Sequence, residues 1–346
     1  MDWNASSAVG GVNMRVRLGA LLVAALMLAA GSLASAGEIT ELRVAKQYGL
    51  GYLQMMVMED MKLVEKHAKA AGLGDVKVNW STFRSSDVMN DALLSGNLDF
   101  ASLGTNGLAT IWAKTKGTSV EVRGAAGFNF LPLALVTREA NVKTIADYTE
   151  KHKIAVPAVR VSNQAILLQM AAAKQFGQSN YAKLDSLTVS MTHPDAMAAL
   201  LSGAGEVGSH FASSPFLQKE LEKPGIRQIV SSTEILGAPL NFNILATTTK
   251  FHAANPKAYA AYLAAMQEAT EIINKDKRAA AELYIRMTKD KSSVDEILKI
   301  MNASGEYNFN QRPEGDMRMI QFMHSIGSIK VKPESWNDLL FPMPGK

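Results

Sequence analysis

The sequence predicts an α/β protein of two lobes, joined by two strands and separated by a ligand cleft. Three observations support this fold class. Short apolar strands alternate with amphipathic helices, the alternation restarts near residue 154, and aromatic and amide residues at 127–130 and 239–243 mark two crossings between the halves. Alternating strands and helices are typical of a mostly parallel sheet with helices on both faces.

The first half of the chain predicts three strands, each followed by a helix. The strands are at residues 42–47, 76–80 and 98–102. After the first strand, apolar residues recur at helical spacing from Leu53 to Val64. Gly96 supplies the C-terminal stop of the helix that precedes the third strand.

The second half repeats this alternation of strands and helices and ends in a run of helices. Strands are predicted at residues 119–123, 131–136, 154–156, 187–189 and 242–248, and a helix at 164–176. We expect the strand at 242–248 to return beside the one at 131–136. Beyond residue 255 the pattern is helical, with a capping box at 292–295, and these helices should cover the outside of the first lobe.

An internal echo in the sequence supports two lobes of similar build. Residues 87–96 resemble residues 195–203 with one residue deleted, although Ala- and Leu-rich helices also resemble one another by chance. We predict a signal peptide at 1–36, the first part of lobe 1 at 37–126, lobe 2 at 127–250, and the completion of lobe 1 with the C-terminal helices at 251–346.

The N-terminal segment predicts export to the periplasm. Arg15 and Arg17 precede an unbroken apolar run at residues 18–30, and Ala34-Ser35-Ala36 has the small-x-small form of a cleavage site, so cleavage is expected after Ala36. The run is shorter than the roughly 20 residues of a membrane span, which argues against the alternative of a retained anchor helix. The absence of cysteine from the 346 residues fits an oxidising compartment.

Composition and motifs exclude several classes of function. Without residues 1–36 the net charge is about +3 and is spread along the chain, so nucleic acid is not an expected partner. The chain lacks the nucleophile elbow, the phosphate loop and the H-E-x-x-H zinc motif. The six histidines lie far apart in sequence, and the Gly49–Gly51 turn lacks the third glycine of a dinucleotide site. We therefore expect no enzymatic activity, no metal and no cofactor.

Loops between strands and helices hold the candidate ligand-binding residues. In open α/β sheets, ligands bind beyond the carboxyl ends of the strands, where helix starts present unpaired N–H groups to anions. Four such loops recur across both lobes. They contain Tyr48 and Gly49, Ser85 and Ser86, Thr105 and Asn106, and Arg160, Ser162, Asn163 and Gln164.

Within these loops we expect Thr105 and Asn106 to cap a helix and Arg160 to bind a carboxylate or sulfonate with two hydrogen bonds. A solvated Arg160 is the alternative. A fifth loop adds His210, with Phe211, facing the cleft, and Ser213 or Ser214 as a helix cap before Pro215; a packed core His-Phe pair is equally compatible. Phe128 belongs to an aromatic and amide stretch suited to closing over an organic ligand.

Several stretches of the chain resemble periplasmic solute-binding proteins of ABC importers, in the nitrate/sulfonate/taurine branch that also includes binders of thiamine pyrimidine precursors. The resemblance covers roughly residues 39–270. The residues that carry it are Leu42-Arg43-Val44-Ala45 with Tyr48, Asp91 to Phe100, Gly104-Thr105-Asn106, Leu133 to Thr137, Lys143 to Tyr148 before Ile154-Ala155-Val156, and Asp195 to Leu200.

The resemblance implies a type II periplasmic binding protein, which closes its lobes on one solute and delivers it to a membrane permease and its ATPase. It also implies that Ser85, Ser86, Thr105, Asn106 and residues 162–164 face the ligand. Where relatives often have a Trp-x-Asp-Pro-Tyr-like stretch, this chain has His210-Phe211-Ala212-Ser213-Ser214-Pro215, which leaves the ligand class open.

The predicted function is capture of a small, anionic organic solute by a monomeric protein. Three alternatives stay open. The same fold could bind a neutral or cationic heterocycle stacked on aromatic residues such as Tyr48 and Phe128. It could also belong to an enzyme of pyrimidine-precursor synthesis or to an exported sensor that hands its ligand to a membrane receptor.

Overall fold

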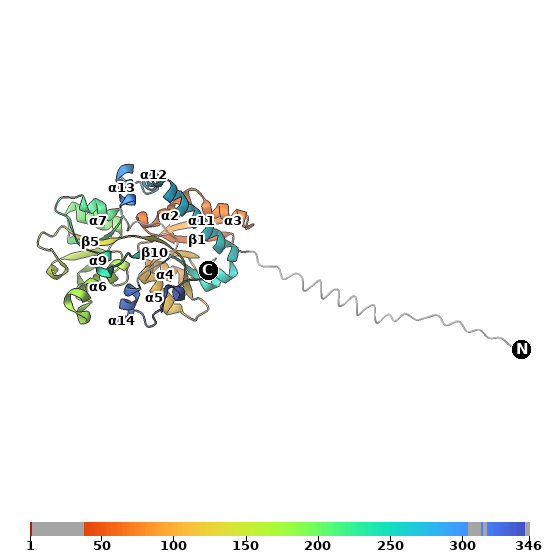
Figure 1. The fold of residues 1–346 in the computed structure, drawn as a ribbon, viewed down its shortest axis with the longest axis horizontal. Coiled ribbons are helices and arrows are strands. Elements are labelled where there is room, and N and C mark those ends of the chain that lie inside the picture. The colour runs from red at the N-terminus through yellow and green to blue at the C-terminus, as the bar shows by residue number, and fades with distance from the viewer. Residues whose placement is uncertain (2–37, 304–312, 314–316, 343–346) are drawn as a thin grey trace. The chain divides into compact units, whose positions relative to one another are not determined.

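The structure is a computed structural model that describes residues 38–303, 313 and 317–342, together with Met1 (Figure 1). The chain divides into two units, Met1–Glu38 and Ile39–Lys346, and everything described below belongs to the second. The predicted signal peptide lies outside the described residues. Across the described part of the chain, no helix combines the length and the apolar character needed to cross a bilayer.

The first sheet has the strand order β2-β1-β3-β10-β4. Its strands are β1 (Glu41–Lys46), β2 (Lys77–Thr82), β3 (Phe100–Gly104), β4 (Val122–Phe130) and β10 (Asn241–Thr248). Strands β1, β2 and β3 are parallel, whereas β10 runs antiparallel to both β3 and β4. The three parallel strands therefore end at one edge of the sheet.

The second sheet repeats this order as β7-β6-β8-β5-β9. Its strands are β5 (Leu133–Thr137), β6 (Lys153–Val156), β7 (Thr188–Ser190), β8 (Val207–Ser213) and β9 (Arg227–Ser231). Strands β6, β7 and β8 are parallel, and β5 is antiparallel to β8 and β9. The predicted fold class is confirmed, because each lobe is a mixed sheet with helices and the chain passes twice between the sheets.

One expectation about the crossing strands is wrong. Strand β10 does not return beside residues 131–136; it pairs with β3 and β4. The strand at 131–136 is β5, and both of its edges are occupied in the second sheet by β8 and β9. The predicted strand at 119–123 and the crossing at 127–130 are parts of one strand, β4, which leads directly into β5.

Helices cover the sheets. They are α2 (Leu53–Asp60), α3 (Leu63–Ala70), α4 (Ser86–Leu94), α5 (Thr105–Thr115), α6 (Asn163–Phe176), α7 (His193–Ser202), α8 (Phe216–Leu221), α9 (Ser232–Leu236), α10 (Thr249–Ala254), α11 (Pro256–Lys275), α12 (Lys277–Thr288), α13 (Val294–Asn302), α14 (Arg318–Ser325) and α15 (Trp336–Leu339). Short 3-10 helices are η1 (Leu50–Tyr52), η2 (Ile145–Asp147), η3 (Gln178–Asn180) and η4 (Asp185–Leu187).

Helices α11 and α12 pack on the first lobe, as predicted, whereas α14 contacts both α5 of the first lobe and α6 of the second. Helix α11 lies against α2 and α3, and α12 against α2 and α13 (Figure 1). The capping box before α13 uses Ser293 and Glu296. The helix predicted from Leu53 to Val64 is two helices, because Lys62 adopts a left-handed φ of 51° between α2 and α3.

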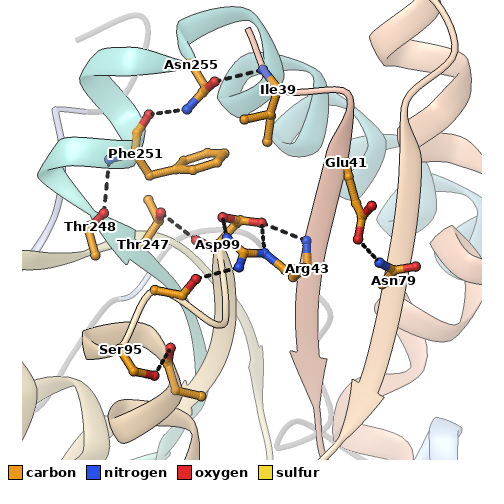
Figure 2. A network of polar contacts seen from close by, with 12 residues as sticks. Ile39, Glu41, Arg43, Asn79, Ser95, Asp99, Thr247, Thr248, Phe251 and Asn255 are labelled. Atoms are coloured by element: carbon orange, nitrogen blue, oxygen red, sulfur yellow. Dashed lines mark hydrogen bonds and ion pairs between the residues drawn. The ribbon is translucent and has the colours of Figure 1, made fainter.

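An ion pair fixes the first sheet at the end opposite the carboxyl termini of its parallel strands (Figure 2). The Arg43 guanidinium on β1 binds the Asp99 carboxylate, at 2.7 Å between Nη2 and Oδ1, and the Arg43 backbone N–H donates to the same carboxylate. Thr247 on β10 donates its hydroxyl hydrogen to the Asp99 carbonyl oxygen at 2.6 Å. These contacts fix the positions of β1, β3 and β10 relative to one another. The opposite ends of these strands, where β1 and β3 lead into helices, are therefore aligned as well.

Candidate functional site

A cavity of about 20 Å³ lies between the two sheets, beyond the carboxyl ends of their parallel strands. A volume of this size holds about one water molecule. Its lining residues come from both lobes. They are Gln47, Tyr48, Tyr52, Ser85, Ser86, Gly104, Pro157, Ser162, Asn163, Gln164, His193, Phe242 and Asn243.

A larger cavity of about 750 Å³ adjoins the small one. Gln47 and Tyr48 line both. The larger cavity is also lined by apolar side chains of both lobes, among them Met56 and Tyr284 of the first lobe and Phe216 of the second. Tyr48 is therefore positioned between a tight polar space and a wider, more apolar one.

Local sequence signals explain how the small polar side chains reach the cavity. Ser162 is the N-cap of α6, and its Oγ accepts a hydrogen bond from Ala165 N at 3.2 Å. Asn163 and Gln164 follow as the first two residues of that helix and project into the cleft. In the other lobe, Ser86 Oγ accepts a hydrogen bond from Gly104 N at 3.0 Å, which holds the start of α4 against the end of β3.

Direct hydrogen bonds close the cleft around this cavity. Asn106 N donates to Asn163 Oδ1 at 3.2 Å, and Asn106 Nδ2 donates to the Val161 carbonyl oxygen. Asn163 Nδ2 donates to the Phe242 carbonyl oxygen at 3.3 Å. The Asn163 carboxamide thus fills the space in front of the N-terminus of α5.

The crossing strands hold the loop after β1. Asn129 Nδ2 on β4 and Asn243 Nδ2 on β10 both donate to the Gly51 carbonyl oxygen, at 2.6 and 3.0 Å. The Tyr52 hydroxyl donates to Asn243 Oδ1 at 3.1 Å, and burial raises the pKa of Tyr52. A Cβ on Gly51 would lie 2.5 Å from the Phe242 ring, so only glycine allows this close approach.

A chain of buried polar side chains leads from the cavity into the second lobe. Gln164 Nε2 lies 3.2 Å from His193 Nε2, His193 Nδ1 lies 2.8 Å from His210 Nε2, and His210 Nδ1 lies 2.6 Å from Glu220 Oε1. Burial lowers the pKa of His210 to about 3 and raises that of Glu220 to about 9; burial, and next the neighbouring His210, lower the pKa of His193.

Six of the residues predicted as ligand-binding line the small cavity. They are Tyr48, Ser85, Ser86, Ser162, Asn163 and Gln164. Gly49, with φ of 102°, lies beside it, where its backbone packs against the Ser214 carbonyl oxygen. Asn106 takes part through the contacts that close the cleft.

The cap expectations for α5 and α8 are wrong. Thr105 and Asn106 do not cap α5; the N-cap is Gly104, and the Thr105 hydroxyl instead donates to the Asn241 carbonyl oxygen. Ser213 and Ser214 do not cap α8, whose N-cap is Pro215. Their hydroxyl oxygens are buried without a partner, as is Asn106 Oδ1.

Four further predicted residues lie away from the cavity lining. Phe128 is fully buried in the core of the first lobe, because it is on the inner face of β4. His210 and Phe211 do not face the cleft; both are fully buried on β8, which favours the alternative of a packed pair. Arg160 leaves 69% of its side chain exposed, and its Nε lies 3.4 Å from Asp185 Oδ2, on the outside of the lobe.

The predicted ligand-binding residues do not include His193, which lines the cavity. Tyr52, at the end of the predicted loop that begins at Tyr48, and Phe242, in the aromatic and amide stretch at the second crossing, line it as well. The wide spacing of the histidines favours a surface or packing role for His193, yet its ring contacts His210. The internal echo contained the signal, since His193 stands two residues before Asp195 as Ser85 stands two residues before Asp87. Both pairs follow the equivalent edge strands β7 and β2. In the described parts of the chain, no group of three or more His, Asp or Glu side chains is arranged to bind a metal.

Comparison with known proteins identifies the family of this chain. The sequence profile of the NMT1-like family matches residues 35–287, which is most of the chain. The chain belongs to the NMT1-like family. No curated protein sequence matches it.

Solved structures share the fold of this NMT1-like protein. The alkanesulfonate-binding protein SsuA from Xanthomonas axonopodis pv. citri, bound to MOPS, superposes with a TM-score of 0.65 at 14% identity, covering 88% of this chain and 97% of that one. The aliphatic sulphonate-binding protein SsuA from Escherichia coli gives 0.61 at 17% identity, covering 88% and 93%. The nitrate-binding protein NrtA from Synechocystis PCC 6803 gives 0.58 at 15% identity, covering 82% and 75%. The fold is that of periplasmic binding proteins, which confirms the resemblance seen in the sequence.

Proposed function

We propose that this protein is the solute-binding subunit of an ABC-type importer. It captures a small anionic organic solute of sulfonate, taurine or nitrate type in the periplasm and delivers it to a membrane permease, without chemistry on the solute. One observation carries the proposal: hydroxyl and carboxamide side chains from both lobes line one cavity at the carboxyl ends of both sheets.

The closed cleft supports capture by lobe movement. Its inner cavity of about 20 Å³ is too small for an organic solute, so a solute that reaches the polar side chains there requires the lobes to separate and close again. The contacts that close the cleft include side-chain hydrogen bonds around Asn106 and Asn163, each of which contributes about 0.5–1.5 kcal/mol. The hydrogen bond from Leu50 N to the Ser214 carbonyl oxygen and the Lys219–Asp290 ion pair also join the lobes. Solute oxygens that replace the Asn163 oxygen at the start of α5 would favour the closed state, because they would contact both lobes.

The partners follow from this role. Sulfonate- and nitrate-binding proteins with the same fold motivate the choice of solute class, and a permease with its ATPase is the expected receiver. The buried oxygens without a partner at Asn106, Ser213 and Ser214 offer further polar atoms to a solute that enters the cleft. We expect the protein to act as a monomer.

The test is a ligand screen on the protein without residues 1–36. The panel contains ethanesulfonate, taurine, nitrate, short carboxylates and a hydroxymethylpyrimidine. A ligand at a hundredfold excess over its Kd should stabilise the fold by about 2.7 kcal/mol, measured as a rise in Tm and checked by calorimetry. If no anion of the panel shifts Tm, the proposal of an anionic solute fails.

A neutral or cationic heterocycle is the second candidate. Tyr48, Tyr52 and Phe242 line the small cavity, and the adjoining cavity of about 750 Å³ is lined by Tyr48 and Phe216. Aromatic rings at this place suit stacking on a flat ligand. Selective stabilisation by the hydroxymethylpyrimidine in the same screen would favour this candidate over an anion.

A further inference from the structure

Four hydrogen-bonded side chains form a path from the interior of the second lobe to the cavity. Glu220 on α8 contacts His210 on β8, His210 contacts His193 at the start of α7, and His193 contacts Gln164 at the start of α6. Glu220 and His210 have no exposed surface, and His193 and Gln164 are 7% and 3% exposed. Only the last two line the cavity.

The hydrogen on Glu220 fixes the direction of every hydrogen bond along this path. With that hydrogen present, the Glu220 O–H donates to His210 Nδ1, so His210 carries its ring hydrogen on Nε2 and donates to His193 Nδ1. His193 then carries its hydrogen on Nε2. Gln164 Nε2, which lies 3.2 Å from that atom, cannot accept this hydrogen, so the Gln164 carboxamide turns by half a turn and presents its oxygen to His193. The NH₂ group of Gln164 is left for the cavity.

Removal of that one proton reverses the path. An ionised Glu220 accepts from His210 Nδ1–H, His210 Nε2 accepts from His193 Nδ1–H, and His193 Nε2 accepts from the Gln164 NH₂ group. The carboxamide oxygen then faces the cavity. This is the orientation in which Gln164 Nε2 faces His193. It differs from the first arrangement by half a turn of the carboxamide, whose oxygen and nitrogen ends have nearly the same shape.

The direction does not depend on which partner holds the proton at neutral pH. If it moves from Glu220 to His210, His210 becomes an imidazolium and still donates from Nε2 to His193 Nδ1. His193 carries its hydrogen on Nε2 in either case. The stacked ring of Phe216, with a centroid 5.6 Å from that of His193, holds the imidazole in place.

Apart from His210, Glu220 contacts no basic side chain, among the residues that the structure describes. Lys219, its neighbour on α8, pairs with Asp290 at 2.5 Å, and Asp195 on α7 accepts a hydrogen bond from Thr192. The packed strand β5 has no titratable side chain, and on β8 the carboxyl faces His210. Glu220 Oε2 is buried without a partner, which would be costly for a carboxylate.

We propose that Glu220 is a positioning residue that sets the ligand preference of the cavity, through His210 and His193, by making Gln164 present its NH₂ group. This inference rests on the proposed solute-binding function. A wall that donates hydrogen bonds selects solutes with acceptor oxygens, such as sulfonates, over solutes that present N–H groups. The raised pKa of Glu220, about 9, keeps its proton in place at neutral pH.

Nitrogen NMR of the histidine rings tests the path without any ligand. At about pH 7, His193 and His210 should both carry the ring hydrogen on Nε2, and above about pH 9 both should carry it on Nδ1. Glu220→Gln should abolish this change of ring hydrogen position. Glu222→Gln, which alters an exposed carboxylate two residues away, should leave it intact. A hydrogen on Nδ1 of His193 at about pH 7 in the unmodified protein would overturn the proposal.

Ethanesulfonate titration tests the consequence for binding. Its affinity should fall at least about tenfold between pH 7 and pH 10 in the unmodified protein and in Glu222→Gln, and change less than about threefold in Glu220→Gln. An equal loss in Glu220→Gln would overturn the proposal. If ethanesulfonate does not bind at all while the ring hydrogens switch as described, the path is supported and the sulfonate function is not. Binding without any switch would support the sulfonate function and overturn the path.

Discussion

The side chain of Asn163 accepts a hydrogen bond from the backbone N–H of Asn106 across the cleft, at 3.2 Å. One residue therefore links the start of α6 in the second lobe to the start of α5 in the first. Its Nδ2 donates to the Phe242 carbonyl oxygen on the crossing strand β10. Asn163 thus contacts helix α5 of the first lobe and the crossing strand β10 at once.

Asn163→Ala should shift the protein toward an open form. Removal of two hydrogen bonds weakens the closed arrangement by about 1–3 kcal/mol, because each contributes about 0.5–1.5 kcal/mol. The radius of gyration from small-angle X-ray scattering should increase. Asn180→Ala is the control, since that carboxamide bonds Phe176 within its own lobe. An unchanged radius in Asn163→Ala would mean that other contacts hold the cleft closed.

Gly104→Ala should obstruct closure. A Cβ at this position would lie 2.4 Å from Asn163 Nδ2, whereas the Gly104 backbone, with φ of −66°, accommodates alanine without strain. We expect at least a tenfold loss of solute affinity in calorimetry with little change in Tm.

The double variant Gly104→Ala with Asn163→Gly is the matched control for this clash. It restores the space, so the affinity should recover part of its loss relative to Gly104→Ala alone. Full affinity in the single variant would show that the closed arrangement described above differs from the bound form.

Arg160→Ala should have little effect on an anionic solute. The exposed Arg160 pairs with Asp185 and lies away from the cavity, so the substitution should lower the free energy of unfolding by less than about 1 kcal/mol. Gln164→Leu, which removes a polar group from the cavity wall, should weaken ethanesulfonate binding more strongly. Calorimetry on both variants compares them directly, and a larger loss in Arg160→Ala would assign the guanidinium to the site.

Stability should depend on pH through the buried Glu220 and the two buried histidines. Glu220 has a raised pKa of about 9 in the folded state, so its contribution is fully present below the unfolded value near 4.5 and is lost as pH rises toward 9. His193 and His210 have lowered pKa values, so their contribution is present above about 6.5 and is lost as pH falls, toward about 3 for His210.

Urea denaturation at about pH 5, 7 and 9 checks this dependence. The free energy of unfolding of Glu220→Gln minus that of the unmodified protein should rise between pH 5 and pH 9, by up to about 1.4 kcal/mol per pH unit. The loss of unfolding free energy at acidic pH, which protonation of the histidines causes, should be similar in both proteins. A difference that stays constant with pH would show that Glu220 is ionised in the folded state.

Local signals were enough for most elements and for much of the site. The restart of the strand and helix alternation after residue 154 predicted α6, and the strand-to-helix loops predicted six of the residues that line the cavity. These features depend on residues close together in sequence. The placement of β10 was wrong because strand pairing is decided between segments far apart, and periodicity does not report which edge of a sheet is free.

The sequence by itself determined two similar α/β lobes, the crossing strands and the polar loops at the strand ends, because turn chemistry and hydrophobic spacing are local properties. The tertiary structure alone decided that His193, His210 and Glu220 form one path, that Arg160 lies outside, and that Asn163 closes the cleft on Asn106. These relationships join residues from different elements, and burial changes their proton affinities, so they exist only once the chain is packed.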